Sequence, residues 1–402
     1  MSNISGQQIK VSIAIALVFS LRLLGIFMFI PVAAFYAETI SPQNSQLITG
    51  LALGICGLVQ AIFQLPLGAL SDKIGRRPVI ICGLLVFIIG SIIAGVNKSV
   101  TALLIGRALQ GAGAIGATTL AALGDLTTFE FRNKAMGIVG VSIGFSFFIS
   151  FFLATILLEY YEVNAVFYLG AIFASVALFV YFYFLHDRLN IRPNRVYNLE
   201  AGIKFCFGRN LFLLNLSVMF LHTIFTAYFL FLPKLIVENL DFMKSELWKI
   251  FIPVLLLSSV SMFSIMRNLD SNKLEVKRIL IYCIIGLFSS IFILEYCKEE
   301  LSMVFICLVW FFASFNIIEA LLPSLVTKIA PADFRGTATG FYSTFQYLGL
   351  FWGGTLGGWT LNNYGIVGLL SSTMILSLVW LGLLWSLNLK KNTTGDNNGK
   401  RC

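Results

Sequence analysis

The sequence GALSDKIGRRP, residues 68–78, joins two apolar stretches, 46–70 and 78–96, each roughly twenty residues long. An α-helix rises 1.5 Å per residue, so about twenty apolar residues are enough to cross the ~30 Å hydrocarbon core of a bilayer. The backbone has no hydrogen-bonding partner in lipid, so such a stretch must be helical. The pattern therefore predicts two membrane-spanning helices connected by a short charged loop.

The composition extends this prediction to the whole chain. Hydrophobic residues make up 58% of the 402 residues and charged residues only 12%. A soluble domain carries roughly 25% charged residues, about twice as many, to cover its surface. The alternating pattern of a membrane barrel is also missing. We therefore expect an all-α membrane protein.

Apolar stretches separated by charged or turn-rich breaks predict twelve transmembrane helices. Their expected ranges are 11–37, 46–70, 78–96, 100–124, 135–158, 164–186, 210–233, 248–266, 277–296, 301–327, 336–360 and 364–388. The seven cysteines form no CxxC pair and lie mostly within or near these spans. We therefore expect these cysteines to pack as small hydrophobic residues and not to form disulfides. We expect no metal site and no cofactor.

The basic residues indicate how the chain is oriented. About three quarters of the 28 Lys and Arg residues fall on alternate connections that share one side with both termini. By the positive-inside rule that side is cytoplasmic. The net charge of +9 is accounted for by these loops, so we do not expect nucleic acid as a partner.

The chain is expected to consist of two similar halves. FRNKAMGIVGVSIGFSF from Phe131 and FRGTATGFYSTFQYLGL from Phe334 share Phe-Arg, a glycine and small residues at equivalent places. Two six-helix halves related by an axis along the membrane normal are a known transporter arrangement. The expected parts are a first bundle 1–186, a cytoplasmic linker 187–209, a second bundle 210–389 and a polar cytoplasmic tail 390–402.

Four ionisable residues lie deep within the predicted spans: Arg22, Arg107, His222 and Glu319. A charge in the bilayer centre costs at least about 2.5–3.5 kcal/mol, so each of them needs a partner or a function. They fall on spans one, four, seven and ten, the first helices of four three-helix units. We therefore predict that these four helices line one central polar cavity.

Each of the four also has a structural interpretation. Arg22 lies too deep to reach the cytoplasmic surface easily, whereas Arg107 could equally well hold helices together. A single membrane histidine such as His222 is often a hydrogen-bonded packing residue. Glu319 is the only acid deep in a span, and a carboxylate that exchanges a proton with either side suits proton coupling.

The loop at 68–78 and the following span resemble one transporter family. A basic loop needs Arg76 and Arg77 but not Gly68, Asp72 or Gly75, and the full pattern is similar to the signature loop of the major facilitator superfamily. GRALQGAGAIGATTLAALGDLT, from Gly106, resembles the second motif of that family. FSLRLLGIFMFIPV from Phe19, Leu221-His222, EALLPSL from Glu319 and the segment from Arg335 resemble its branch of proton-driven drug exporters.

The resemblance implies roles for individual residues. Gly68, Gly75, Asp72, Arg76 and Arg77, together with Asp125 at the inner end of span four, would form a gating motif that holds the outward-facing state. Asp72 would oppose the N-terminus of span eleven, and Arg76 would pair with Asp125. Arg107 would belong to the proton-coupling machinery.

Two features differ from that branch. Its members carry a soluble domain after the last span, and we expect this chain to lack that domain because only the tail 390–402 follows. The exporter motif of span five contains Gly-Pro, whereas this chain has Ala154-Thr155.

The sequence thus predicts a proton-coupled transporter of the bacterial inner membrane. We expect it to export a drug-like small molecule in exchange for protons, working as a monomer among membrane lipids. One alternative is uptake or facilitated transport of a metabolite or siderophore-like anion, with Arg22 and Arg107 binding it. Another is a non-transporting receptor on the same fold. An enzyme is not expected, because no HExxH, paired intramembrane aspartates or nucleophile-base pair is present.

Overall fold

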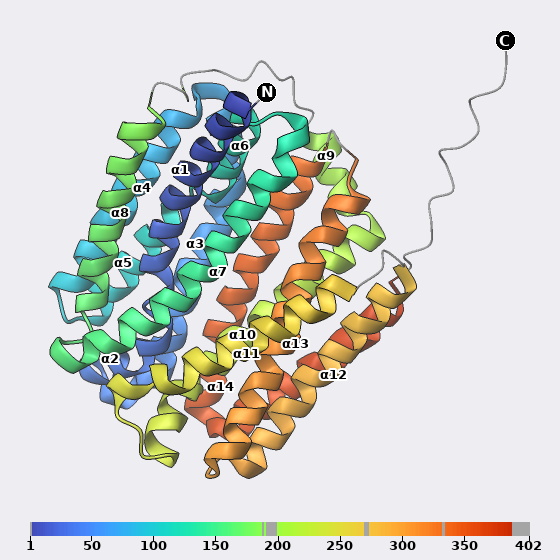
Figure 1. Ribbon diagram of the computed structural model, residues 1–402. Helices are drawn as coiled ribbons and strands as arrows, with labels where there is room; N and C mark the ends of the chain where they lie inside the picture. Colours follow the sequence, from blue (N-terminus) through green and yellow to red (C-terminus); the bar gives the residue numbers. More distant parts are fainter. Residues whose placement is uncertain (1, 187–188, 190–198, 269–272, 332–333, 388–402) are drawn as a thin grey trace.

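The computed structural model describes residues 2–186, 189, 199–268, 273–331 and 334–387, and the regular elements in them are all helices (Figure 1). The predicted tail 390–402 and residues 187–188 and 190–198 of the predicted linker 187–209 lie outside the described residues. The first part contains α1 Ser2–Phe27, η1 Ile30–Val32, α2 Ala33–Ile40, η2 Pro42–Asn44, α3 Ser45–Ile74, α4 Arg76–Val96, α5 Val100–Ala112, α6 Gly116–Leu126, α7 Phe129–Tyr160 and α8 Ala165–Phe184. The second part contains α9 Leu199–Cys206, α10 Arg209–Asn239, η3 Lys244–Glu246, α11 Trp248–Asn268, α12 Lys273–Cys297, α13 Leu301–Ile329 and α14 Arg335–Trp385.

Eleven described helical segments are long and apolar enough to cross a membrane, and the last of them accounts for two crossings. α14 has 51 residues, about 77 Å at 1.5 Å per residue, which is more than twice the thickness of the hydrocarbon core. Gly365 interrupts it with φ of 67° and ψ of −167°, a conformation that favours glycine. The twelve predicted spans are therefore present. The last break is at Gly365, slightly beyond the predicted gap at 361–363.

Spans one and four are broken helices, which differs from the continuous helices expected at 11–37 and 100–124. Pro31 lies in the short turn between α1 and α2, where it cannot donate a backbone hydrogen bond. Gly113 follows α5, and a Cβ there would meet the carbonyl of Gly83 on α4. The hydrophobic runs did not reveal these breaks because the residues around them are still apolar.

The helices form two groups that follow the order of the chain. In the first group α1 packs against α7 and α8, α4 against α5 and α8, and α3 against α5. In the second, α10 packs on α14, α11 on α13 and α12 on α13. The two groups meet chiefly where α3 lies along α14 and where α7 crosses α11, as Figure 1 shows.

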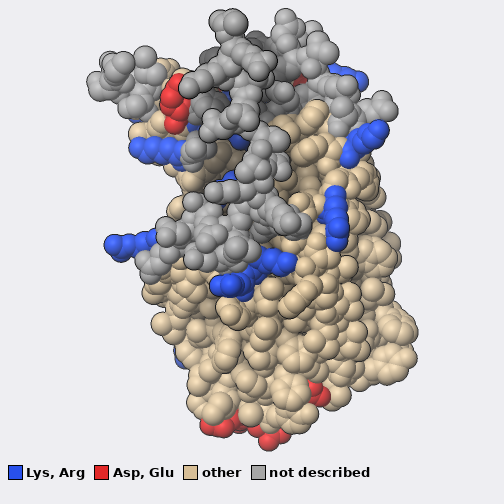
Figure 2. Space-filling view, turned by 90° about the vertical axis from the view of Figure 1, so that its right-hand side faces the viewer, with Lys and Arg blue, Asp and Glu red and all other residues tan. Residues whose placement is uncertain are grey.

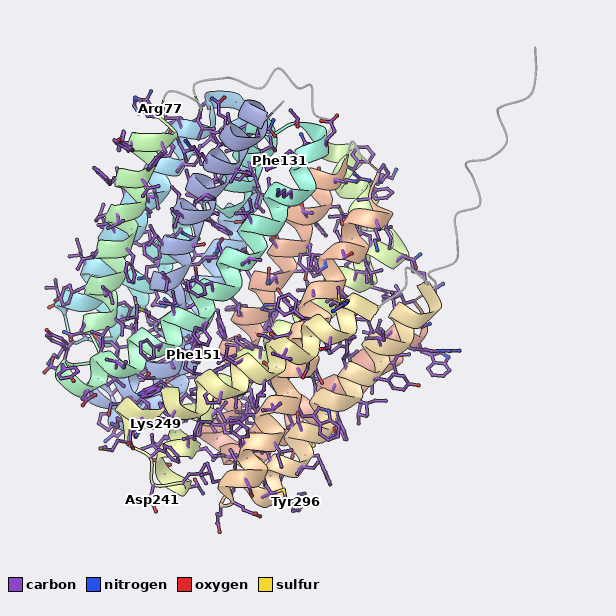
Figure 3. The ribbon with its side chains drawn as sticks, in the orientation of Figure 1. Arg77, Phe131, Phe151, Asp241, Lys249 and Tyr296 are labelled. Carbon is purple, nitrogen blue, oxygen red and sulfur yellow. The ribbon has the colours of Figure 1, made fainter. Side chains whose placement is uncertain are left out.

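The surface separates into an apolar band and two charged ends. On the face shown in Figure 2, most Lys and Arg lie in the upper half together with a few Asp and Glu, the bottom edge carries Asp and Glu, and uncharged residues fill most of the region between. Figure 3 places Arg77 and Phe131 at one end and Asp241, Lys249 and Tyr296 at the other. By the positive-inside rule the end with Arg77 is cytoplasmic.

The short helix α9 lies outside the spans, on the cytoplasmic end of α14. A Cβ on Gly202 would lie 2.9 Å from the Thr337 hydroxyl oxygen, and the rings of Phe205 and Phe334 stack with centroids 5.8 Å apart. Burial raises the pKa of the Cys206 thiol to about 11. At neutral pH this cysteine is therefore an unreactive thiol that packs like a small hydrophobe.

Candidate functional site

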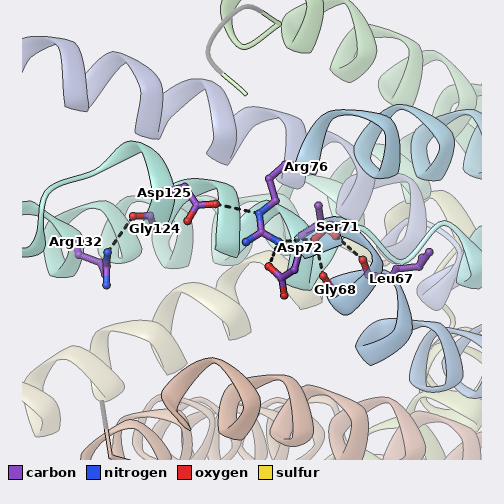
Figure 4. Close-up of polar contacts among 9 residues, drawn as sticks. Leu67, Gly68, Ser71, Asp72, Arg76, Gly124, Asp125 and Arg132 are labelled. Atoms are coloured by element: carbon purple, nitrogen blue, oxygen red, sulfur yellow. Dashed lines mark hydrogen bonds and ion pairs between the residues drawn. The ribbon is translucent and has the colours of Figure 1, made fainter. Parts of the chain in front are cut away.

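The cytoplasmic loop between α3 and α4 holds a compact cluster around Arg76 (Figure 4). Gly75 has φ of 99°, which favours glycine and lets α4 begin immediately after α3 ends. The turn buries Arg76, whose Nη1 lies 2.6 Å from Asp72 Oδ1 and donates to Ser71 Oγ at 2.6 Å. Its Nε donates to Asp125 Oδ2, at the end of α6, over 3.0 Å. One guanidinium thus connects three helices.

The other residues of the predicted gating motif surround this cluster. The carbonyl of Gly68 accepts a hydrogen bond from Ser71 Oγ at 2.7 Å, and a Cβ at position 68 would lie 3.3 Å from Ala117. Arg77 is partly exposed and forms no ion pair among the described residues. Within the same residues the ion-pair partner of Asp72 is Arg76, and no hydrogen bond joins Asp72 to the first amides of α14.

In the first half of the molecule Arg107 is buried and forms two hydrogen bonds and a cation–π contact. Its Nε donates to the carbonyl of Ala52 at 3.1 Å, and its Nη1 donates to Gln110 Oε1 at 2.7 Å. The guanidinium lies over the Phe29 ring, 4.7 Å from the centroid. Gln110 in turn donates to Ser91 Oγ at 2.8 Å. These contacts connect span four to spans one, two and three.

Arg22 contacts the backbone of the same glutamine, whereas Arg107 contacts its side chain. Its Nη2 donates to the carbonyl of Gln110 over 3.2 Å, and its guanidinium lies 5.5 Å from the centroid of the Phe87 ring. α5 ends two residues beyond Gln110, so this carbonyl lies where the regular helical hydrogen bonds stop and is available to a side-chain donor. The break in span four therefore helps to place Arg22.

In the second half, His222 of α10 and Glu319 of α13 meet at Gln346 of α14. The Gln346 amide nitrogen lies 2.9 Å from His222 Nε2 and donates to Glu319 Oε1 over 3.0 Å. His222 Nε2 lies 3.8 Å from Glu319 Oε2, and its Nδ1 lies 3.2 Å from the carbonyl of Val218. A neutral imidazole with its proton on Nδ1 satisfies both histidine contacts, because Nε2 then accepts from Gln346.

The four predicted ionisable residues thus form two separate pairs, one in each half. Gln110 joins the two arginines, and Gln346 joins His222 to Glu319. Tyr347 of α14 lies close enough to both Arg22 and Glu319 to interact electrostatically with each.

Neither Gln110 nor Gln346 was among the predicted site residues. Gln110 lies within the family motif that begins at Gly106, and this motif could have singled it out. Nothing in the sequence distinguished Gln346.

A helical membrane protein with twelve spans in two groups, buried charges at its centre and a charged cytoplasmic loop between spans two and three has the features of a secondary transporter. The chain belongs to the Major Facilitator Superfamily, whose model matches residues 15–354. It is therefore a multi-pass membrane transporter and not an enzyme.

Similar proteins of known name or structure agree with this family assignment. The chain is 37% identical to the inner membrane transport protein YajR of Escherichia coli K12, over 90% of this chain and 80% of YajR. It is 28% identical to the class B tetracycline resistance protein of Escherichia coli over 48% of each chain. The solved structure of a bacterial homolog of the human lysosomal transporter Spinster, inward-facing and occupied, has a TM-score of 0.74. That match has 16% identity and covers 93% of this chain and 95% of the other.

Proposed function

We propose that the chain is a proton-coupled exporter of small molecules in the bacterial inner membrane, with Glu319 as its proton-carrying residue. The observation that carries the proposal is the position of Glu319. It lies ten residues, about 15 Å, from the cytoplasmic end of α13, and its side chain is still 33% exposed. A carboxylate at this depth is costly when ionised, and exposure gives it access to protons.

The contacts of Glu319 suit a group that changes protonation state. In the described arrangement the Gln346 amide donates one hydrogen bond to the Glu319 carboxylate and another to His222 Nε2. If His222 gains a proton on Nε2, that nitrogen becomes a donor and must turn from the Gln346 amide toward Glu319 Oε2. Proton uptake by this trio therefore changes how α10, α13 and α14 contact one another, and this can shift the balance between transport states.

Support for export comes from the relatives. YajR is named as an inner membrane transport protein, and the tetracycline resistance protein is named for protection against a drug. The Ala154-Thr155 difference in span five does not interrupt the helix. The Thr155 hydroxyl donates to the carbonyl of Phe151 at 2.8 Å, and α7 is continuous from Phe129 to Tyr160. We propose that the chain acts as a monomer, with protons and a small molecule as ligands.

The Glu319→Gln variant tests this function. An efflux-deficient bacterial strain expressing the chain is first screened against antibiotics and dyes, and an exported compound is then used with proteoliposomes that contain a pH indicator. We expect the compound to drive proton flux in the wild type and Glu319→Gln to reduce that flux at least about tenfold, because an amide cannot carry the proton. The exposed Glu299→Gln variant serves as the matched control. Unchanged pH dependence in Glu319→Gln would contradict the proposal.

The contacts between the halves at the periplasmic end suggest how the transporter closes on that side. Lys234 Nζ of α10 lies 2.7 Å from Glu38 Oε1 of α2, and Lys244 Nζ lies 4.7 Å from the centroid of the Phe35 ring. The rings of Phe152 and Trp248 meet edge to face at 5.7 Å. We propose that these contacts stabilise a state closed toward the periplasm.

Reversing the charge at Lys234 should weaken that closed state. Lys234 also pairs with Glu238 on its own helix, so the Lys234→Glu variant places a third carboxylate beside those of Glu38 and Glu238. We expect the population with separated periplasmic ends to increase about threefold, the effect of a partly exposed ion pair. Spin labels attached at Lys98 and Lys298 report the separation as a distance distribution. The double variant Lys234→Glu/Glu38→Lys should restore the wild-type distribution. If the double variant stays as open as the single one, the pair does not hold the ends together.

A further inference from the structure

Arg22 differs from Arg107 because most of its hydrogen-bonding capacity is unused. Its side chain is completely buried, only Nη2 has an acceptor, and both Nε and Nη1 lack a partner. Arginine remains protonated in proteins, so these are donors of a permanent charge. A buried charge without partners costs free energy that packing alone does not recover.

No acidic side chain neutralises this charge in the part of the chain that the structure describes. The ion pairs there involve Arg76, three lysines and His222, but neither Arg22 nor Arg107. The group that interacts electrostatically with Arg22 from the other half is the neutral phenol of Tyr347. The first half therefore carries a positive charge at its centre that lacks an anion.

Other unpartnered polar atoms lie on the helices around Arg22. Gln64 Oε1 of α3 is buried and has no hydrogen-bond partner. Gln60 Nε2, one turn earlier, is also buried and forms no hydrogen bond of good geometry, but it lies close to the Tyr347 phenol. The Gln64 amide nitrogen would lie 3.2 Å from a Cβ at Gly116, the first residue of α6, and Phe19 of α1 would lie 3.4 Å from the same point. Phe19 precedes Arg22 by one turn. Polar groups of spans one and two thus converge near the start of α6.

The start of α6 adds a second feature that favours an anion. Because span four breaks between Ala112 and Gly116, the 11-residue helix α6 begins inside the membrane. The first amides of a helix have no intrahelical acceptor, and the helix dipole gives this end a partial positive charge. Broken helices of transporters place such ends toward anionic groups of substrates. The aromatic rings of Phe19 and Phe87 supply apolar surface beside these donors.

We propose that Arg22, together with Gln60, Gln64 and the first amides of α6, binds the anionic group of the transported compound, which is therefore an organic anion with an apolar body. A guanidinium is suited to a carboxylate or similar group because it can donate two parallel hydrogen bonds. The inference rests on the proposed export function and names the substrate class for it. An inside-negative membrane potential drives anions outward, which agrees with export.

Four probes that share one ring system test the charge preference. Binding of 2-naphthoate, 2-naphthalenesulfonate, 2-naphthamide and 2-naphthylmethylammonium to the purified full chain in lipid nanodiscs is measured by calorimetry. We expect the two anions to bind about tenfold more tightly than the amide or the cation, and Arg22→Gln to abolish this preference. Arg22→Lys should keep part of it. The surface variant Lys98→Gln should keep all of it. Equal binding of charged and uncharged probes, or an anion preference that survives in Arg22→Gln, would overturn the proposal.

Thermal unfolding provides a measurement that needs no ligand. If the role of Arg22 is to bind the anionic group of the substrate, Arg22→Gln should leave the Tm unchanged or raise it, because the variant removes a buried charge that has few partners. Arg107→Gln should lower the Tm, because Ala52 and Gln110 lose their donor. Equal losses of Tm in both variants would show that Arg22 is structural and contradict the proposal. Glu319→Gln should retain the anion preference, so failure of the anion site and failure of proton coupling give different results.

Discussion

The Arg76→Ala variant should unfold at a markedly lower temperature and transport at least about tenfold more slowly than the wild type. The side chain is buried and pairs with Asp72, Asp125 and Ser71, so its removal leaves two carboxylates and a hydroxyl without their donor. Breaking a fully buried ion pair costs about 3–5 kcal/mol. Here the side chains of Asp72 and Asp125 are 46% and 27% exposed, and solvent screening reduces the expected loss to about 2 kcal/mol.

Two further variants separate the charge of Arg76 from its shape. Arg76→Lys keeps the charge but lacks the fork that reaches Asp72 and Asp125 simultaneously, so it should recover only part of the lost stability. Lys73→Gln removes an exposed cation from the same loop and should leave both the Tm and the transport rate near wild type. The cluster would have no gating role if Arg76→Ala were destabilised but exchanged between inward and outward states at the wild-type rate.

The fold was predictable from the sequence because the length of an apolar run has a direct physical meaning in a bilayer. The breaks inside spans one and four were not, because the same residue types have different effects in different helices. Pro31 lies at a break, yet Pro66, Pro233 and Pro323 lie inside helices that continue past them. A proline removes one backbone donor, and neighbouring helices decide whether the chain bends, breaks or continues.

The candidate site was predictable in its charges but not in its pairing. An ion in lipid is costly, so ionisable residues within long apolar stretches are conspicuous in the sequence, and these are Arg22, Arg107, His222 and Glu319. An uncharged amide costs less, so Gln346 is not conspicuous in the sequence until it is found between two titratable groups. The single cavity expected from the equivalent spans stays a prediction. The structure shows one pair in each half, with Tyr347 close to both Arg22 and Glu319.

The backbones of α3 and α14 approach so closely that a single added methyl group should have a large effect. We define the glycine seam as Gly50, Gly54 and Gly57 of α3 with Gly354 and Gly358 of α14. A Cβ at Gly354 would meet the carbonyl of Gly50 and would lie 2.8 Å from the nitrogen and 3.0 Å from the Cα of Gly54. All three atoms belong to backbone and cannot move aside by changing a rotamer. Small residues of this kind allow close helix contact in membranes.

Gly354→Ala should therefore separate the two halves along the glycine seam. Overpacking typically costs 1–3 kcal/mol, and we expect a loss of about 3 kcal/mol because backbone must shift on both sides. Gly144→Ala is the matched control. A Cβ there would meet no atom within 4 Å, so alanine should raise the stability of α7 by up to about 1 kcal/mol through helix propensity. Thermal unfolding of the purified variants measures both changes, and their opposite signs distinguish contact at the glycine seam from a general effect of replacing glycine. A wild-type Tm for Gly354→Ala would mean that α3 and α14 can move apart without cost. In that case the seam would be a sliding contact between the halves and not a fixed junction.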